Sequence, residues 1–313
     1  MIRTWVLGSG GLLGGSILGE LGKQRQWYFS ASTPFMWSDP TVLNTQFVSE
    51  LADFFSHFAS GDQWQIIWAA GKSTMRTPES ACQRETAVLQ DFLLKLTQAL
   101  QTNPYEGCFG FASTAGGIYT QSHPENITEL SPVSQSTPYA RQKLVQERLL
   151  SEWASECGLC TRLIIGRFST LYGMHQDQSK NQGLISAITQ CIALHKPLSL
   201  FVPLETKRDY LWSEDAARMF LWHLQEKIYP KHSAIRLIAQ EESISIAAML
   251  EQFKFITGQQ VKVSQSPELP AGIYPLEIHF QSQYPVTDPH FQKLSLSEGI
   301  EKILAQSSST HAK

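Results

Sequence analysis

Short apolar runs alternate with amphipathic segments along the first half of the chain. The run from Arg3 to Leu7 is apolar and leads into glycines and then a helical segment that ends near Gly22. We expect further strands at residues 27–30, 35–37, 65–71, 107–113 and 161–168. Helical periodicity lies between them, at residues 44–58, 85–100 and 139–156. Strands that alternate with amphipathic helices predict an α/β fold with a Rossmann-type, doubly wound parallel sheet.

The alternation weakens after about Phe168, where Gly, Pro and Gln interrupt shorter elements. This change predicts a smaller, discontinuous C-terminal part that binds substrate. We expect a dinucleotide-binding domain over residues 1–168 plus about 207–240. The substrate-binding part then takes about 169–206 plus 241–313, and its Ser-rich end from Gln306 to Lys313 is expected to be a frayed tail.

Composition and charge narrow the function classes. With 313 residues, of which 42% are hydrophobic and 17% charged, the chain can bury a full core. The formal net charge of −3 and the pI of about 6.3 provide no general field for a nucleic acid or an anionic membrane. We therefore expect neither partner, and any phosphate must be bound by local groups.

The first residues superficially resemble a secretory signal peptide, because one Arg precedes an apolar run of small residues. Glycines at positions 10, 11, 14 and 15 would make that run a poor helix, whereas a strand, a glycine turn and a helix explain every residue. No other apolar run is long enough to span a bilayer. We expect a cytoplasmic protein.

Five scattered cysteines suit a reducing compartment. Cys157 and Cys160 form a C-x-x-C pair, but no second pair and no nearby His completes a zinc site. We therefore expect no metal.

Gly8, Gly11 and Gly14 form a Gly-x-x-Gly-x-x-Gly pattern at the turn from the first strand to the first helix. Such glycines allow a tight turn, close approach of a cofactor pyrophosphate, and close packing of helix on strand. The helix N-terminus then offers free N–H groups to the phosphates. The pattern predicts a dinucleotide site, which Ala69 and Ala70, at the end of a neighbouring strand, would border; an ordinary tight βα turn is the alternative.

Cofactor choice depends on the end of the second strand, where an acidic residue would normally accept the adenosine ribose hydroxyls. The chain has Ser30 there, which removes a charge that would repel a 2′-phosphate and so favours NADP over NAD. No well-placed Arg supports this preference, because Arg25 precedes the strand. Asp39 is expected either to bond the adenine or to cap the helix that starts at Pro40.

Tyr139 and Lys143 stand four residues apart at the start of a predicted helix, so both side chains share one face. A free tyrosine, with a pKa of about 10, is a poor base at neutral pH, and a nearby ammonium favours its phenolate. The spacing also occurs by chance on helix surfaces. It gains weight from Ser113 and Thr114, which end a strand at the sheet edge where ligands bind in such folds.

Residues 111–147 read FASTAGGIYTQSHPENITELSPVSQSTPYARQKLVQE. Later stretches are RFSTLYG (167–173), QGLISAI (182–188), RDYLWSEDAA (208–217), SISIAAMLEQFKFITG (243–258) and LSLSEGIEKIL (294–304). Together they resemble the extended short-chain dehydrogenase/reductase family, also called the NAD-dependent epimerase/dehydratase family, over nearly the whole chain.

The resemblance implies roles for individual residues. Tyr139 would be the acid/base, Lys143 its activator and ribose ligand, and Thr114 or Ser113 the partner of the substrate hydroxyl. Substrate contacts would come from Tyr119, Thr170 and Arg208, with Arg208 meeting a diphosphate. A surface ion pair with Asp209 or Asp215 is the other interpretation of Arg208.

Four positions depart from the family pattern. Ala115 and Gly116 follow Thr114, where 4,6-dehydratases of the family carry an acidic pair, so dehydration is disfavoured. Thr170 and Glu85 each stand where the family commonly has Asn, which changes the expected substrate contacts.

These observations predict an NAD(P)-dependent epimerase or oxidoreductase that acts on a carbinol or ketone of a nucleotide-sugar-like substrate. An NADP-dependent ketoreductase of a non-sugar small molecule and a non-catalytic, cofactor-sensing regulator are the alternatives. The helices at 85–100 and 139–156 have more apolar surface than the sheet covers, and their family counterparts pair between subunits. A homodimer is therefore expected.

Overall fold

The computed structural model describes residues 1–119, 126–157, 161–174, 183–226, 233–265 and 276–311. A six-stranded sheet forms its centre, in the order β2-β1-β3-β4-β5-β9, and every neighbouring pair is parallel. The strands are β1 (Ile2–Leu7), β2 (Tyr28–Phe29), β3 (Gln63–Trp68), β4 (Gly107–Thr114), β5 (Thr161–Phe168) and β9 (Ser233–Ile238). The predicted Rossmann-type α/β fold is confirmed.

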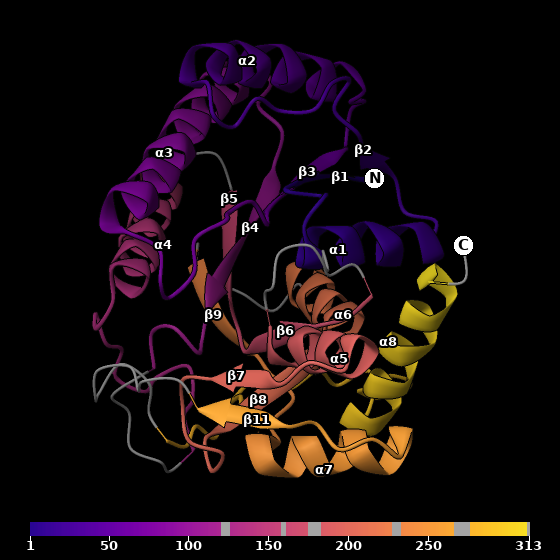
Figure 1. Cartoon of the computed structure of the whole chain (residues 1–313). Helices are drawn as coiled ribbons and strands as arrows, with labels where there is room; N and C mark the ends of the chain where they lie inside the picture. The colour runs from indigo at the N-terminus through magenta and orange to yellow at the C-terminus, as the bar shows by residue number, and fades with distance from the viewer. Residues whose placement is uncertain (120–125, 158–160, 175–182, 227–232, 266–275, 312–313) are drawn as a thin grey trace.

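Helices cover both faces of the sheet. On one face lie α2 (Pro40–Ser56), α3 (Glu79–Thr102) and α4 (Pro138–Glu156), and on the other lie α1 (Leu12–Lys23) and α6 (Ser213–Gln225) (Figure 1). In β1, Trp5 packs in the core toward α2 and α3, and its neighbour Val6 packs in the core toward α1 and α6. Because both faces are buried, the strands have nearly continuous apolar sequences, which is why they could be found as unbroken runs.

Local capping chemistry sets the start of two helices. The Asp39 carboxylate accepts hydrogen bonds from the Thr41 and Val42 amides, and Pro40 occupies the first helical position of α2. The Thr137 hydroxyl accepts from the Ala140 amide at 3.1 Å and Pro138 follows it, so α4 begins there. Of the two roles expected for Asp39, the structure shows the helix cap.

The strand predicted at residues 35–37 is wrong. The Met36 amide donates to the side-chain oxygen of Gln46 at 2.8 Å, and the Met36 carbonyl accepts from the Asp39 amide in a turn. The rings of Phe35 and Trp37 lie against Phe47 of α2. These aromatic residues thus pack on a helix from a loop, without strand hydrogen bonds, although their composition is typical of a strand.

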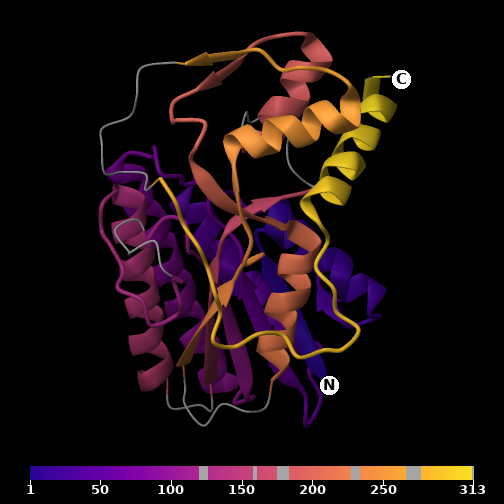
Figure 2. The ribbon, with the colours of Figure 1, turned by 90° about the horizontal axis from the view of Figure 1, so that it is seen from below.

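A second group of elements lies beyond the carboxyl ends of the sheet strands, at the end opposite the N-terminus (Figure 2). It contains a three-stranded sheet of β6 (Thr170–Tyr172), β8 (Lys207–Trp212) and β10 (Ser243–Ser245), and a pair of β7 (Leu198–Leu200) and β11 (Val263–Gln265). Helices α5 (Leu184–Leu194), α7 (Ile246–Thr257) and α8 (Leu296–His311) complete it. The frayed tail predicted from Gln306 is wrong in part, because α8 continues to His311. Within the described ranges, no helix has the length and apolar character needed to cross a membrane.

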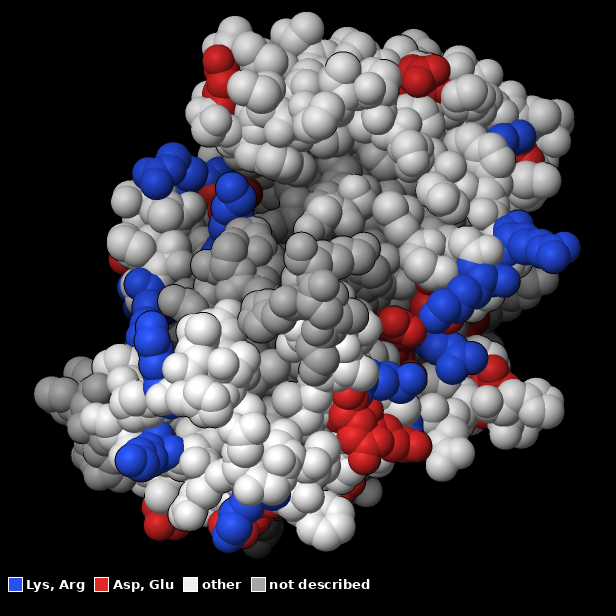
Figure 3. All heavy atoms as spheres, turned by 45° about the vertical axis from the view of Figure 1, so that its right-hand side comes forward, with Lys and Arg blue, Asp and Glu red and all other residues white. Residues whose placement is uncertain are grey.

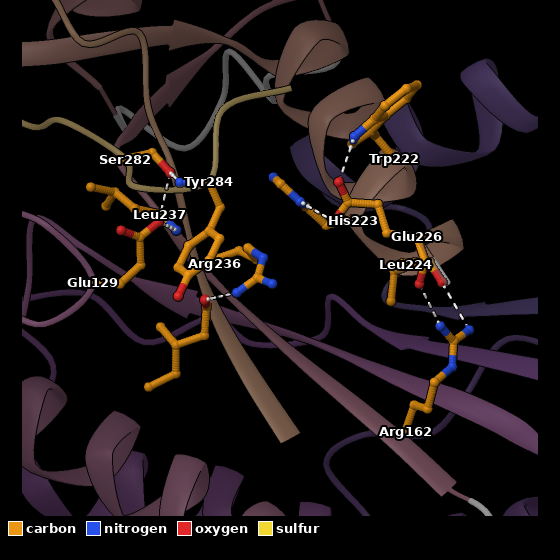
Figure 4. Close-up of polar contacts among 11 residues, drawn as sticks. Glu129, Arg162, Trp222, His223, Leu224, Glu226, Arg236, Leu237, Ser282 and Tyr284 are labelled. Carbon is orange, nitrogen blue, oxygen red and sulfur yellow. Dashed lines mark hydrogen bonds and ion pairs between the residues drawn. The ribbon is translucent and has the colours of Figure 1, made fainter. Parts of the chain in front are cut away.

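The buried carboxylate of Glu129 ties the far end of β9 to the returning C-terminal segment. It accepts hydrogen bonds from the Leu237 amide at 3.0 Å and the Ser282 hydroxyl at 2.6 Å (Figure 4). The Gln283 amide also donates to it, at 3.0 Å. Beside it, Arg236 lies 3.9 Å from the ring centroid of Tyr284. Three segments that are distant in the sequence therefore meet at one carboxylate.

His223 of α6 points toward this region and is 1% exposed, with Nδ1 3.3 Å from a Glu226 carboxylate oxygen (Figure 4). Burial lowers the pKa of His223, and the positive charge of Arg236 lowers it further, while Glu226 and Glu129 oppose the shift. The unfolded chain therefore takes up a proton near pH 6.5 that the folded protein refuses. Stability should fall as the pH falls through that value.

Thermal unfolding at about pH 7.5 and about pH 5.5 measures this effect. We expect His223→Gln to lose less stability on acidification than the unmodified protein, because Gln cannot be protonated. His57→Gln, at a half-exposed position, is the control and should leave the loss unchanged. An equal loss in the unmodified protein and His223→Gln would contradict the assignment.

Candidate active site

The turn after β1 is shaped by glycines. Gly8 has φ +89°, a backbone conformation that favours glycine, and its carbonyl accepts from the Gly11 amide at 3.0 Å. A Cβ on Gly14 would lie 2.2 Å from the Gly8 carbonyl oxygen, so α1 can approach β1 this closely only without a side chain there. Gly11 is the N-cap of α1 and has no side chain to cap the first-turn amides. This cradle fits an anionic pyrophosphate.

A cavity of about 450 Å³ opens beside this turn. It lies at the carboxyl ends of β1 and β3, where the strand order changes direction, which is where open α/β sheets bind ligands. The space-filling view shows a hollow between the upper part of the molecule, which includes α2, and the lower part, which includes α7 (Figure 3). The residues that line the cavity are Gly10, Gly11, Leu12, Leu13, Ala69, Ala70, Gly71, Lys72, Ser73, Glu85, Ala112, Ser113, Thr114, Tyr139, Lys143, Phe168, Ser169 and Leu171.

Thr114, Tyr139 and Lys143 lie together on the wall of this cavity. Tyr139 and Lys143 come from the first turns of α4, and Thr114 ends β4 and hydrogen-bonds to Tyr139. Lys143 is 8% exposed, and its Nζ donates to the Ala112 carbonyl at 3.1 Å and lies 4.7 Å from the Phe111 ring centroid. One strand end and one helix start thus bring the three groups to a single wall.

Burial dominates the ionisation of this pair. It raises the pKa of Tyr139 to about 12, with Glu85 raising it further and the hydrogen bond with Thr114 lowering it. Burial also lowers the pKa of Lys143 to about 8, against the opposing effect of Glu85 and Glu147. Tyr139 is therefore a phenol at neutral pH, and Lys143 is mostly an ammonium that loses its proton more readily than a free lysine.

The Ser113 hydroxyl is bound by a buried ion pair behind the cavity wall. Its hydroxyl donates to Glu147 Oε1 at 2.5 Å, and Glu147 Oε2 lies 2.6 Å from Arg167 Nη2. Arg167 also donates to the Tyr119 hydroxyl at 2.5 Å. Tyr119 is fully buried in this network, whereas the sequence predicted a substrate contact for it.

Glu85 is a site residue that the sequence indicated only as a departure from the family pattern. Its Oε1 accepts from the Lys72 amide at 2.6 Å and from the Ser73 amide at 2.9 Å. It therefore holds the loop after β3 against α3, on the wall that carries Tyr139 and Lys143. No local pattern reveals this, because the carboxylate and the two amides are twelve or more residues apart.

The remaining predicted residues lie outside the cavity lining. Ser30 is exposed at the end of β2. Thr170 lies in β6 opposite Tyr210 of β8, and is half-buried. Arg208 of β8 donates from Nη1 to the Lys207 carbonyl at 2.6 Å.

The described residues contain no group of three His, Cys, Asp or Glu side chains that could hold a metal ion. Cys157 is half-buried with a free thiol, and Cys160 lies outside the described residues, as does Pro124 of the family-like stretch.

One family model and two proteins of known sequence match this chain. The model of the "NAD dependent epimerase/dehydratase family" matches residues 53–235. The dTDP-4-dehydro-6-deoxyglucose reductase of Escherichia coli is 30% identical over 156 residues, which cover 49% of this chain and 48% of the reductase. A putative UDP-glucose 4-epimerase of Methanocaldococcus jannaschii is 26% identical over 117 residues, 37% of this chain and 38% of the epimerase. The matches thus span half or less of these two relatives.

Solved structures match over the full length. The Thermotoga maritima UDP-glucose 4-epimerase with UDP-glucose superposes with a TM-score of 0.77 at 17% identity, covering 100% of both chains. MoeE5 in complex with UDP-glucose and NAD gives a TM-score of 0.78 at 14% identity, covering 98% of this chain and 99% of MoeE5. The Thermus thermophilus UDP-glucose 4-epimerase with NAD gives 0.74 at 19% identity, covering 97% and 98%. At these identities the likeness shows the fold.

Proposed function

Since the chain belongs to the NAD-dependent epimerase/dehydratase family, we propose that it transfers hydride at a carbinol or ketone carbon of a nucleotide-sugar-like substrate. One observation carries the proposal. Thr114, Tyr139 and Lys143 line the same cavity as the glycine turn after β1, so acid/base groups and a pyrophosphate cradle share one space. The relatives, a sugar-nucleotide reductase and a putative epimerase, support a substrate of this class.

Gly8, Gly11 and the first-turn amides of α1 would hold the cofactor pyrophosphate. The backbone at Ala69 and Ala70 would pass beside the cofactor, and Lys143 would bind the nicotinamide ribose. The Ser73 hydroxyl is buried in the cavity wall with no hydrogen-bond partner among the described residues, which leaves a polar group for a ligand.

The bound nicotinamide would supply or accept the hydride. In the reducing direction, Tyr139 donates its phenolic proton to the carbonyl oxygen, and in the oxidising direction it takes the proton of the carbinol. Thr114 holds the same oxygen through its hydroxyl, and the Lys143 ammonium stabilises the phenolate. Because Tyr139 is a phenol at neutral pH, the site is prepared to donate a proton to a ketone.

The substrate would extend from this wall toward Thr170, in the part of the chain that we assign to substrate binding, about 169–206 plus 241–313. It would also reach Arg208, which belongs to the neighbouring segment 207–240. The dinucleotide domain would comprise 1–168 plus about 207–240. Elimination of water is not expected, because Ala115 and Gly116 put no acidic side chain next to Thr114. We also propose a homodimer that pairs α3 and α4 between subunits.

Titration with NADH, followed by nicotinamide fluorescence, tests the cofactor site first. A panel of UDP- and dTDP-linked sugars and their 4-keto forms then tests turnover. We expect NADH to bind and to be oxidised by a keto sugar, or interconversion of two sugars with no net consumption of cofactor if the protein is an epimerase. Binding without turnover of any sugar would contradict the proposal and favour a cofactor sensor.

A further inference from the structure

The segment after β2 leaves the sheet beside the glycine turn. In the parallel register of β1 and β2, Thr4 pairs with Tyr28 and Trp5 with Phe29. The residues that follow Phe29 therefore run alongside the residues that lead into Gly8. The inference rests on the proposed function: with the cofactor pyrophosphate at the glycine turn, its adenosine ribose would lie between these two segments, as in other folds of this type.

Glu50 of α2 contacts this segment after β2. Its side chain is buried, with 4% exposed, and both oxygens are directed to one residue. Glu50 Oε1 accepts from the Ser32 hydroxyl at 2.5 Å, and Oε2 accepts from the Ser32 amide at 3.1 Å. Both hydrogen-bond donors of Ser32 are thus engaged, and its exposed hydroxyl oxygen keeps only lone pairs for a ligand.

Among Asp, Glu, Lys and Arg, the segment around Ser32 and Glu50 contains only the two acidic types. Residues 26–71 contain no Lys or Arg, so this stretch, which includes all of β2, α2 and β3, offers no cation for a 2′-phosphate. Its other acidic residues have other partners. Asp39 caps α2, Asp53 lies 3.6 Å from His57, and Asp62 pairs with Arg3 and the N-terminal amine at the other end of β1.

We infer that Glu50, acting through Ser32, makes the site selective for NAD over NADP. The Ser32 oxygen can accept a hydrogen bond from the ribose 2′-hydroxyl of NAD. The 2′-phosphate of NADP would meet an oxygen without a proton to donate, next to a buried carboxylate, and residues 26–71 supply no cation to compensate. The acidic residue that the sequence lacks at the end of β2 is supplied by α2, which reverses the preference for NADP predicted from Ser30.

The Glu50→Gln variant separates charge from shape. The Gln amide can donate to the Ser32 oxygen, which frees the hydroxyl proton for a phosphate while the size of the side chain is kept. We expect the unmodified protein to bind NADH at least about tenfold more tightly than NADPH, and Glu50→Gln to reduce that ratio by about tenfold, chiefly by tightening NADPH. Nicotinamide fluorescence gives both dissociation constants.

Two further variants complete the test. Glu129→Gln changes another buried carboxylate that binds backbone amides away from the cavity, and should keep the ratio of the unmodified protein. Ser32→Ala keeps Glu50 and removes the hydroxyl, so it should weaken NADH and leave NADPH weak; it also tests the inference if Glu50→Gln unfolds in a thermal melt. Equal or tighter binding of NADPH by the unmodified protein overturns the inference alone, whereas failure to bind either cofactor overturns the proposed function as well.

Discussion

Replacing Tyr139 by Phe is expected to lower kcat by about 10²–10⁴-fold, the usual contribution of a positioned acid/base. The change removes one oxygen and keeps the ring that packs on the cavity wall beside Thr114. The affinity for NADH should stay close to that of the unmodified protein, because Lys143 and the glycine turn are untouched. Loss of kcat with retained binding is the signature of a group that acts on the proton in the reaction.

Steady-state kinetics with whichever sugar nucleotide turns over, together with the NADH titration, measures both quantities. Tyr284→Phe is the matched control, since this tyrosine is 45% exposed and packs beside Arg236, away from the cavity. A kcat for Tyr139→Phe within threefold of the unmodified protein would remove Tyr139 from the role of acid/base.

Replacing Arg167 by Met is expected to reduce the free energy of unfolding by about 3–5 kcal/mol. Arg167 and Glu147 are 6% and 7% exposed and form the buried ion pair behind the catalytic wall. Without the guanidinium, the Glu147 carboxylate remains buried with only the Ser113 hydroxyl as its short partner, and the Tyr119 hydroxyl loses its donor. We attribute this loss of stability to the buried charge of Glu147, which Arg167→Met leaves without a cation. Met keeps an apolar stem in place of the Arg stem, so lost packing should contribute less.

Urea unfolding of a double variant tests this explanation. Arg167→Met with Glu147→Leu removes both charges, and should regain a large part of the stability that Arg167→Met alone loses. Arg148→Met, which breaks an exposed pair with Glu152, should change stability by less than about 1 kcal/mol. A double variant no more stable than Arg167→Met would show that packing around the side chains, and not the unpaired charge, causes the loss.

The parts of the fold that were predictable from the sequence depend on local signals. The run into Gly8 and the Pro138–Tyr139 start of α4 carry their structure within a few residues, by turn chemistry and capping. Parallel strands end at one edge of a sheet, which is why Thr114 could be expected near Tyr139. The central fold and the placement of Thr114 near Tyr139 could therefore be predicted from such simple rules.

Other features depend on contacts that no local pattern encodes. The Glu50 side chain meets Ser32 across eighteen residues, and Glu147 meets Arg167 across twenty, both through tertiary packing. Phe35 and Trp37 are residue types typical of a strand, but their rings pack against Phe47 on α2. In each case the sequence contains the residues, and the packing of α2 or α4 on the sheet decides which partner they find.

The position of β9 has a consequence for the order in which the molecule is built during translation. β5 runs from Thr161 to Phe168 and its outer neighbour begins only at Ser233, after the whole of β6, α5, β7, β8 and α6. A growing chain that has emerged as far as β5 can pair this strand with β4 on one side only, so its outer edge is left unpaired, and such an edge can pair with other chains. The Glu129 contacts that fasten β9 wait still longer, for Ser282. Until β9 and Ser282 have emerged, the outer edge of β5 is more open to pairing with other chains than it is in the finished molecule.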